Sequence, residues 1–373
     1  MNLRTAYCLA LLLFLTLVAL KFSPQTGFTS LIRFGETWQD RRPSALLNLP
    51  LAIVPNSNGY DGQFYAQIAL DPLLRSAELK QSVDAPEYRA RRILAPATAA
   101  ILGFGSPWWT LQAYALLNVI CWLALGWLLR PQTGSSNWTG FARWVGCMFS
   151  MGVLESVRQS LVDLPALLLL VLAVKAYAPV PASRSTLWLA LGNLAKETTL
   201  LGTFALQGDQ LVKRPRWKRA WLNLAIAALP IALWSVYVHT RFIGWPGSAG
   251  SGNFTWPLLG LLSQTKSSLQ EILQGNLEGR HTFGLIAIAG LLTQLLVLWR
   301  SPQLQSPWWR IGAAYSILLL FLGSWVWSGY WAACRALLPM TVAFNLLLPA
   351  QRHFWPLWVL GNLTLLHAVW RFL

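Results

Sequence analysis

The sequence predicts an all-α, polytopic integral membrane protein with about 11 transmembrane helices. Of its 373 residues, 55% are hydrophobic and only 11% are charged. Many apolar stretches approach the ~20 residues that a helix needs to cross a bilayer. Trp occurs 22 times, and Trp favours the headgroup region, where its ring is buried and its N–H stays hydrated. We therefore expect a single integral membrane domain over residues 1–373.

Apolar stretches mark the helices in chain order. Arg4 precedes the first stretch as in a signal peptide, but no small-x-small cleavage site follows, so we expect an uncleaved first helix. The segment 92–104 contains Pro96 and is about 13 residues long, which favours an interfacial helix over a spanning one. The predicted spans are 6–22, 107–129, 138–155, 163–178, 185–195, 197–211, 220–240, 282–300, 309–328, 332–349 and 354–371.

Two of these spans, 185–195 and 197–211, are short for a bilayer. We interpret them as a hairpin of short helices that is broken around Asn193 to Glu197. A single long helix over 185–207 is the alternative. The hairpin places the basic short loops of the chain on one side of the membrane.

Basic residues give the expected orientation. The net charge of +16 is compatible with a nucleic-acid partner, but Lys and Arg lie mostly in short loops between apolar spans, which is the distribution that orients membrane helices. The strongest cluster, at 213–219, is assigned to the cytoplasm. Two long loops, 23–106 and 241–281, then lie on the extracytoplasmic side, and neither resembles an independent domain.

The segment 59–65 reads Gly-Tyr-Asp-Gly-Gln-Phe-Tyr and follows the first span closely. A carboxylate held by small and aromatic residues just outside a bilayer is suited to be a catalytic base, which makes Asp61 the first candidate. Gly59 and Gly62 allow tight backbone turns, and Tyr60 and Tyr65 are suited to wall a pocket or stack on a sugar. The structural alternative is that Asp61 caps a short helix beginning at Gly62.

Further charged residues lie beside apolar segments. Arg89, Arg91 and Arg92 enter the interfacial segment, where Arg is suited to bidentate phosphate binding or, alternatively, to anchoring on anionic headgroups. Charges at the edge of a bilayer are costly and usually face a cavity or a partner, although long side chains also extend to the interface. The remaining candidates of this kind are Arg158 and Asp163, which are close enough in sequence to form a structural ion pair, together with Lys196, Glu197 and Arg335.

Several chemistries find little support. The sequence has no Walker loop and no G-x-G-x-x-G motif, and its four His residues form no ligand cluster, which argues against a zinc or Ser/His/Asp mechanism. The four Cys residues show no paired spacing, so neither a disulfide framework nor a zinc site is expected.

Four features together resemble the GT-C superfamily of polytopic glycosyltransferases, which use lipid-phosphate-linked sugars. They are the first helix, the large outer loop with its Asp, the Arg-Arg-Ile-Leu-Ala-Pro segment and the hairpin with Lys-Glu-Thr. The segment 59–65 with the later stretch 89–94 resembles, more narrowly, bacterial membrane proteins associated with cell-surface glycopolymer formation. The resemblance covers the layout of roughly the first 220 residues.

The resemblance implies that Asp61 acts as general base on the acceptor, with cations binding the departing phosphate. Some members carry Asp-x-Asp and bind a divalent metal, but Gln63 stands where the second Asp would be, so no cofactor and no metal site are expected. The implied partners are a polyprenyl-phosphate sugar donor, a glycan or lipid acceptor and membrane lipids, with no nucleic acid. The predicted substrate-binding residues are Tyr60, Gln63, Tyr65, Arg89, Arg92, Arg158, Asp163, Lys196, Glu197 and Arg335.

The implied location is the bacterial inner (cytoplasmic) membrane, with the active site on the extracytoplasmic face. Two other functions stay open. One is a lipid-linked saccharide transporter or flippase, which predicts charges spread through the membrane depth. The other is a glycopolymer polymerase or ligase. Transfer chemistry predicts charges gathered at one face.

Overall fold

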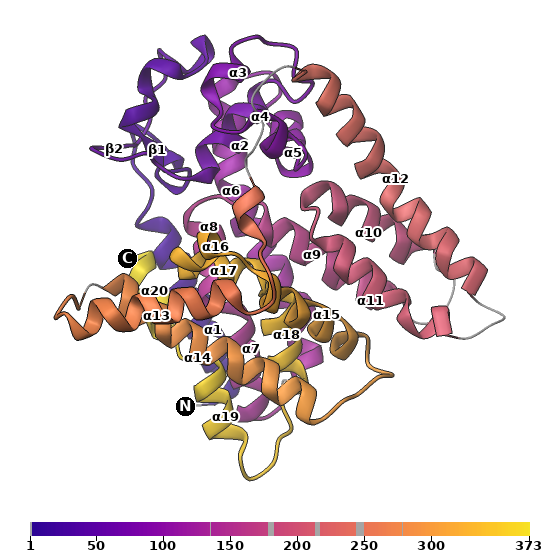
Figure 1. The fold of residues 1–373 in the computed structure, drawn as a ribbon. Coiled ribbons are helices and arrows are strands. Elements are labelled where there is room, and N and C mark those ends of the chain that lie inside the picture. Colours follow the sequence, from indigo (N-terminus) through magenta and orange to yellow (C-terminus); the bar gives the residue numbers. More distant parts are fainter. Residues whose placement is uncertain (1, 135, 178–182, 213–216, 244–249, 278) are drawn as a thin grey trace.

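The computed structural model describes residues 2–134, 136–177, 183–212, 217–243, 250–277 and 279–373. Residues 213–216, part of the basic cluster that predicts the cytoplasmic side, lie outside this set. Helices dominate the described chain, so the all-α class is confirmed. Figure 1 shows residues 34–102 gathered at one end of a helical bundle, with the N-terminus near the other end.

Three helices in the described ranges are long and apolar enough to cross a membrane. They are α6 (Pro107–Leu129, extended by a 3-10 turn to Thr133), α12 (Trp217–Arg241) and α14 (Gly279–Arg300). α12 exposes a row of apolar side chains that includes Ile226, Leu233 and Val236. Such a face is costly in water and favourable against lipid, so the chain is a membrane-associated protein.

The N-terminal helix α1 (Leu3–Ala19) is apolar but shorter. It leads into the first long loop, which is folded rather than extended. The loop holds a parallel pair of two-residue strands, β1 (Phe34–Gly35) and β2 (Ile53–Val54), and four helices, α2 (Asp61–Leu70), α3 (Leu79–Ser82), α4 (Pro86–Ala90) and α5 (Leu94–Leu102). α5 has 9 residues, too few to cross a bilayer.

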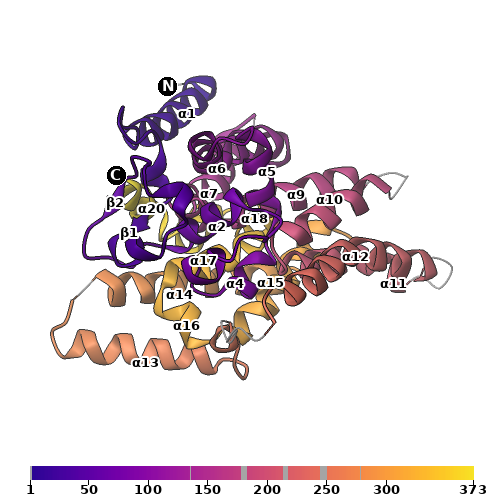
Figure 2. The same cartoon turned by 90° about the horizontal axis from the view of Figure 1, so that it is seen from above.

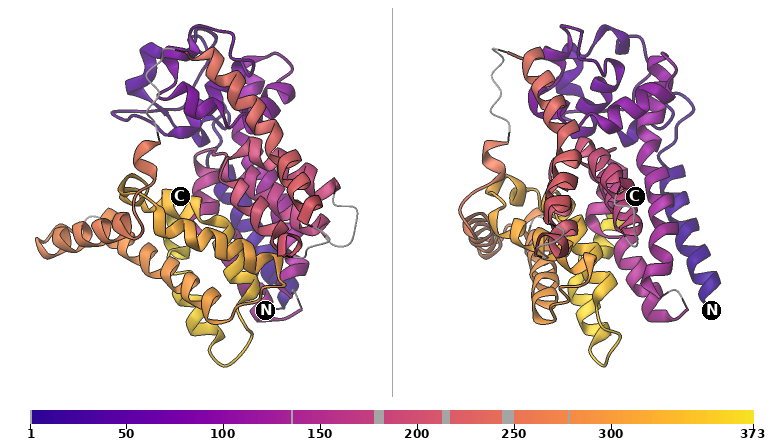
Figure 3. Two further views of the ribbon diagram at one scale, coloured as in Figure 1. Left: turned by 45° about the vertical axis from the view of Figure 1, so that its right-hand side comes forward. Right: turned by 90° about the vertical axis from the view of Figure 1, so that its right-hand side faces the viewer.

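The C-terminal end of α12 holds this loop in place. The Trp234 indole N–H donates to the carbonyl of Ala90 (2.7 Å), and Arg241 Nε donates to the carbonyl of Leu74 (2.9 Å). Figure 3 shows the N-terminus and the folded first loop at opposite ends of the bundle. The loop therefore closes one end of the helices.

Separate helices occupy the region of the predicted hairpin. α9 (Asp163–Ala176) is followed by α10 (Ser183–Ala195) and α11 (Thr199–Val212). The turn between α10 and α11 begins at Lys196, whose carbonyl accepts from the N–H of Thr199 (3.0 Å). The break between two short helices is confirmed, and the alternative of a single helix over 185–207 is wrong.

Four predicted spans are not continuous helices, so the prediction is wrong in this respect. The structure divides 138–155, 309–328, 332–349 and 354–371 each into two helices. The pairs are α7 (Trp138–Met148) with α8 (Met151–Arg158), α15 (Pro307–Phe321) with α16 (Ser324–Ser328), α17 (Tyr330–Ala336) with α18 (Leu338–Leu347), and α19 (Phe354–Gly361) with α20 (Leu365–Phe372).

Neighbouring side chains make these breaks tolerable. Pro339, which has no N–H, lies in the first turn of α18. At the end of α19, the carbonyl of Gly361 accepts from Gln294 Nε2 (2.7 Å) on α14. Broken helices persist at membrane depth where protein groups satisfy the freed backbone in this way.

The second long loop, 241–281, contains α13 (Leu259–Leu273), which runs beside α14 along one edge of the molecule (Figure 2). Its start is joined to the end of α15, because the N–H of Thr255 donates to the carbonyl of Phe321 (2.9 Å). The segment before α13 also touches the first loop, because Asn253 Nδ2 donates to the hydroxyl of Tyr88 (3.2 Å).

Candidate functional site

The two glycines around Asp61 set its position by different means. Gly59 has a positive φ of 66°, so the expected turn is confirmed there. Gly62 lies inside helix α2, and a Cβ at this position would come within 2.1 Å of the carbonyl oxygen of Gln159. The first turn of α2 therefore packs directly on the end of α8, which a larger residue would prevent.

Asp61 is the first residue of α2, and its side chain forms an ion pair. Arg89 Nη2 donates to Asp61 Oδ1 (2.9 Å), while Arg89 also makes two bonds to the carboxylate of Asp84 (3.0 and 2.8 Å). The helix has Tyr60 at its N-cap and no side-chain cap, so the capping role for Asp61 is wrong. Burial acts to raise the pKa of Asp61, but the charges of Arg89 and Arg335 outweigh it and lower the pKa.

Arg92 lies between α4 and α5 and joins the first loop to the turn after α10. It forms an ion pair with both carboxylate oxygens of Glu197, and it donates to the hydroxyls of Tyr65 (2.8 Å) and Tyr88 (2.6 Å). Burial opposes ionisation of Glu197, but Arg92 outweighs it and lowers the pKa of this carboxyl to about 2. The pair is therefore charged at neutral pH.

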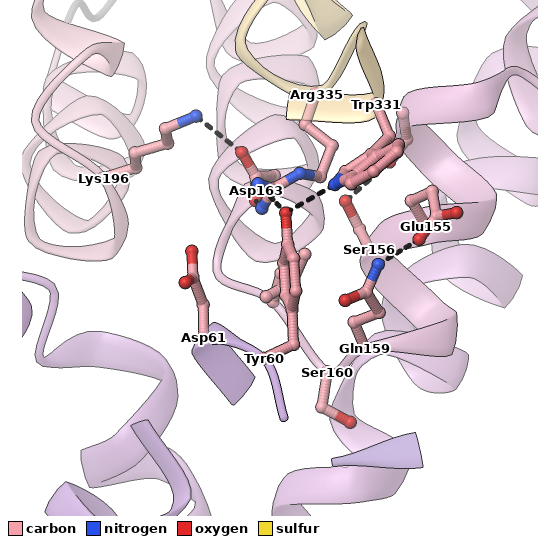
Figure 4. Close-up of polar contacts among 12 residues, drawn as sticks. Tyr60, Asp61, Glu155, Ser156, Gln159, Ser160, Asp163, Lys196, Trp331 and Arg335 are labelled. Atoms are coloured by element: carbon pink, nitrogen blue, oxygen red, sulfur yellow. Dashed lines mark hydrogen bonds and ion pairs between the residues drawn. The ribbon is translucent and has the colours of Figure 1, made fainter. Parts of the chain in front are cut away.

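Asp163, at the start of α9, binds two cations from distant elements (Figure 4). Lys196 Nζ donates to Oδ1 (2.5 Å) and Arg335 Nη1 to Oδ2 (3.2 Å). Arg335 Nη2 donates further to the hydroxyl of Tyr60 (3.0 Å), which also accepts from the Trp331 indole (2.8 Å). Arg335 Nε is buried and has no hydrogen-bond partner among the described residues.

These groups line one cavity of about 360 Å³, named here the Asp61 cavity. Its charged lining residues are balanced, with four acids (Asp61, Asp84, Asp163, Glu197) and four bases (Arg89, Arg92, Lys196, Arg335). Tyr60 and Tyr65 also line it, and burial raises the pKa of Tyr60 to about 12, so its hydroxyl is neutral. Eight of the ten predicted substrate-binding residues, together with Asp61, thus line a single cavity.

Two predicted substrate-binding residues, Gln63 and Arg158, do not line this cavity. Gln63 is fully buried, accepting from the N–H of Gly35 (3.0 Å) and donating to the carbonyl of Asn58 (2.7 Å). It supports the turn before α2. Arg158 pairs with Glu155 (3.4 Å) rather than with Asp163, so the ion pair between Arg158 and Asp163 is wrong. Arg158 faces a different cavity.

The site also contains residues that were not predicted. Asp84 holds Arg89 through two bonds, and Tyr88 receives bonds from Arg92 and from Asn253 Nδ2 (3.2 Å) in the second long loop. The sequence could have indicated Tyr88 as a site residue, because it lies one helical turn before Arg92. No sequence feature indicated Asn253, because its contact depends on how the two long loops meet.

No group of three or more His, Cys, Asp or Glu side chains that could hold a metal ion occurs in the described ranges. Each cavity carboxylate is instead bonded to Arg or Lys. A scan against protein-family models, a search of curated proteins and a search of solved structures find no match to this chain. Its function is therefore argued from the geometry of the site.

Proposed function

We propose that the chain is a membrane glycosyltransferase, which moves a sugar from a polyprenyl-phosphate donor to a glycan or lipid acceptor at the extracytoplasmic face. One observation carries the proposal. An ionised carboxylate, Asp61, lines the same cavity as two cations, Lys196 and Arg335, which Asp163 holds in place. Sugar transfer from a lipid phosphate needs these two functions together, a proton acceptor and a cation for the leaving group.

The proton acceptor is Asp61. The bond that Arg89 makes to it uses Oδ1, and the side chain keeps 28% of its surface exposed. Oδ2 is thus available to the acceptor hydroxyl. As the new bond from the acceptor oxygen to the sugar carbon forms, the hydroxyl proton passes to Asp61, and Arg89 holds the carboxylate in place.

The leaving group is the lipid phosphate, which departs with the electron pair of the sugar–oxygen bond. Arg335 and Lys196 are both held by Asp163, which fixes their positions before the substrate arrives. Preorganised cations stabilise charge as it develops in the transition state.

The membrane topology of the proposal has about 11 crossings. Several of these are made by pairs of short helices, such as α17 with α18. The lipid tail of the donor lies against the apolar helix faces, and its phosphate reaches the cavity at the end of the bundle. A transporter is favoured less, because the charged groups of the site gather at the ends of α9, α10 and α11 rather than along their length.

The test is reconstitution of the purified protein in liposomes with a panel of polyprenyl-phosphate sugars, measuring release of polyprenyl phosphate. Release that requires an added glycan or lipid acceptor supports the proposal, and the acceptor distinguishes simple transfer from polymerisation or ligation. The Asp61→Asn variant should be inactive, whereas Asp40→Asn, at an exposed acid of the same loop, should resemble wild type. Movement of the intact donor across the bilayer without release would favour a transporter instead.

A further inference from the structure

A second cavity, of about 480 Å³, lies on the other side of Tyr60. Three arginines line it, Arg33 before β1, Arg158 at the end of α8 and Arg371 in α20, and we name it the three-arginine cavity. Tyr60 lines both cavities. Its hydroxyl accepts from Trp331, which lines this cavity, and from Arg335, which lines the Asp61 cavity (Figure 4). Tyr60 thus forms a wall between the two cavities.

The charge of this cavity is not balanced. Its lining residues in the described part of the chain include no carboxylate, and the nearby Glu155, which is 1% exposed, pairs with both Arg158 and Arg371. The side chain of Arg33 makes no hydrogen bond or ion pair with any described residue. Three guanidinium groups thus have one carboxylate near them, which pairs with two of the three, and two positive charges stay uncompensated.

The backbone holds Arg33 in an unfavourable conformation. Its φ of 58° is rare for a residue other than glycine, and the carbonyl of Arg33 accepts from the N–H of Tyr60 (3.1 Å). Such strain persists where surrounding structure fixes it and gathers at functional sites. Gly59, whose Cβ would come within 2.5 Å of the same carbonyl, permits the close approach. Tyr60 is therefore fixed against the segment that carries Arg33.

We propose that the three-arginine cavity binds a phosphorylated ligand, independently of the transfer reaction assigned to the Asp61 cavity. Like charges brought together repel unless an anion joins them, and guanidinium groups match phosphate oxygens in geometry. Arg371 also stacks on the ring of Trp331, at 4.4 Å, which orients its donors. A phosphate compensates the two surplus charges.

The phosphate has two sources, a lipid headgroup or a soluble phosphate. Trp370, at the edge of the cavity, is 68% exposed, and exposed Trp is typical of the membrane interface. A single-chain lipid phosphate and inorganic phosphate carry the same charged group, so they serve as probes that separate the sources.

The experiment places a fluorophore at the edge of the cavity, through Trp370→Cys in a Cys8→Ser background. The other three cysteines are buried and do not compete for the label. Dodecyl phosphate in detergent micelles and inorganic phosphate are titrated separately at constant ionic strength. A saturable change in fluorescence with dodecyl phosphate alone assigns a lipid ligand. A saturable change with both probes assigns a soluble phosphate ligand.

Variants of Arg33 test whether the arginines bind the probe. Arg33→Gln removes a side chain that has no partner, so folding should survive, and affinity should fall tenfold to hundredfold because a charge-assisted bond is lost. Arg33→Lys should keep most of the affinity, and Arg91→Gln, at an exposed arginine paired with Glu87, should bind as wild type. The proposal is overturned if neither probe saturates, or if Arg33→Gln binds as tightly as wild type.

Discussion

The Asp61 cavity and the three-arginine cavity share the wall formed by Tyr60, but they compensate charge differently. In the first, four acids face four bases, and each carboxylate is bonded to a cation. In the second, three arginines line the cavity, and Glu155 pairs with two of them, Arg158 and Arg371. A balanced network holds reactive groups in fixed positions, whereas surplus positive charge attracts an anion. This difference agrees with the two proposals, transfer chemistry in the first cavity and anion binding in the second.

The largest expected effect breaks the first cavity alone. Asp61→Asn keeps size and hydrogen bonding but cannot accept a proton at neutral pH, so transfer should fall about 10²–10⁴-fold. Phosphate binding in the three-arginine cavity should not change, because Asp61 does not line it. Turnover in liposomes and the fluorescence titration measure the two effects. Activity within a few-fold of wild type would remove Asp61 from the mechanism.

A second expectation concerns the buried acid beside each cavity. Asp163 and Glu155 each pair with two cations, and their side chains are 5% and 1% exposed. Asp163→Asn and Glu155→Gln leave buried charges unpaired, so each should lower the free energy of unfolding by about 3–5 kcal/mol. Thermal unfolding in detergent measures this.

The same pair of variants sharpens the comparison. Phosphate should partly restore the stability of the Glu155→Gln variant, since the bound anion replaces the lost carboxylate in a cavity that binds phosphate. The control is Asp40→Asn, at an exposed acid. Wild-type stability of both buried variants would mean that these acids do not hold the cations in place.

A smaller effect is expected where α2 packs on the end of α8. Gly62→Ala places a Cβ within 2.1 Å of the Gln159 carbonyl, so α2 must shift from α8, and overpacking of this kind costs about 1–3 kcal/mol. Gly284→Ala is a matched control, because its Cβ meets only the Ser268 hydroxyl oxygen, at 3.8 Å. Thermal unfolding compares the two. Equal stability of both variants would contradict the close packing inferred here.

Charged residues beside apolar segments were predictable from the sequence, because such charges must face a cavity or a partner. That local rule selected Arg92, Lys196 and Arg335, which line the Asp61 cavity. The pairing was not predictable. Asp163 accepts hydrogen bonds from Lys196 and Arg335, which lie 33 and 172 positions further along the chain. No spacing rule connects these residues.

The other differences between prediction and structure have the same origin. Gln63 lies in the right motif, but whether its amide faces the cavity or the backbone depends on β1, which passes beside it. Continuous helices were expected because a sequence shows apolarity rather than the side chain that satisfies a break, as Gln294 does for Gly361. Tertiary contacts decide both cases.

The smallest expected effect is a shift in pH dependence that sharpens the role of the balanced network. Burial acts to raise the pKa of Asp61, and Arg89 is the first of the charges that lower it. A lowered pKa keeps the base ionised as the pH falls, so wild-type transfer should lose activity only below the ordinary range of an Asp carboxyl. Arg89→Gln removes that charge while burial continues to act, so the acid limb of kcat/KM should move to higher pH. Arg91→Gln, outside the cavity, should leave the limb in place. A limb that stays or moves to lower pH in Arg89→Gln would show that Arg89 does not set the ionisation of the base.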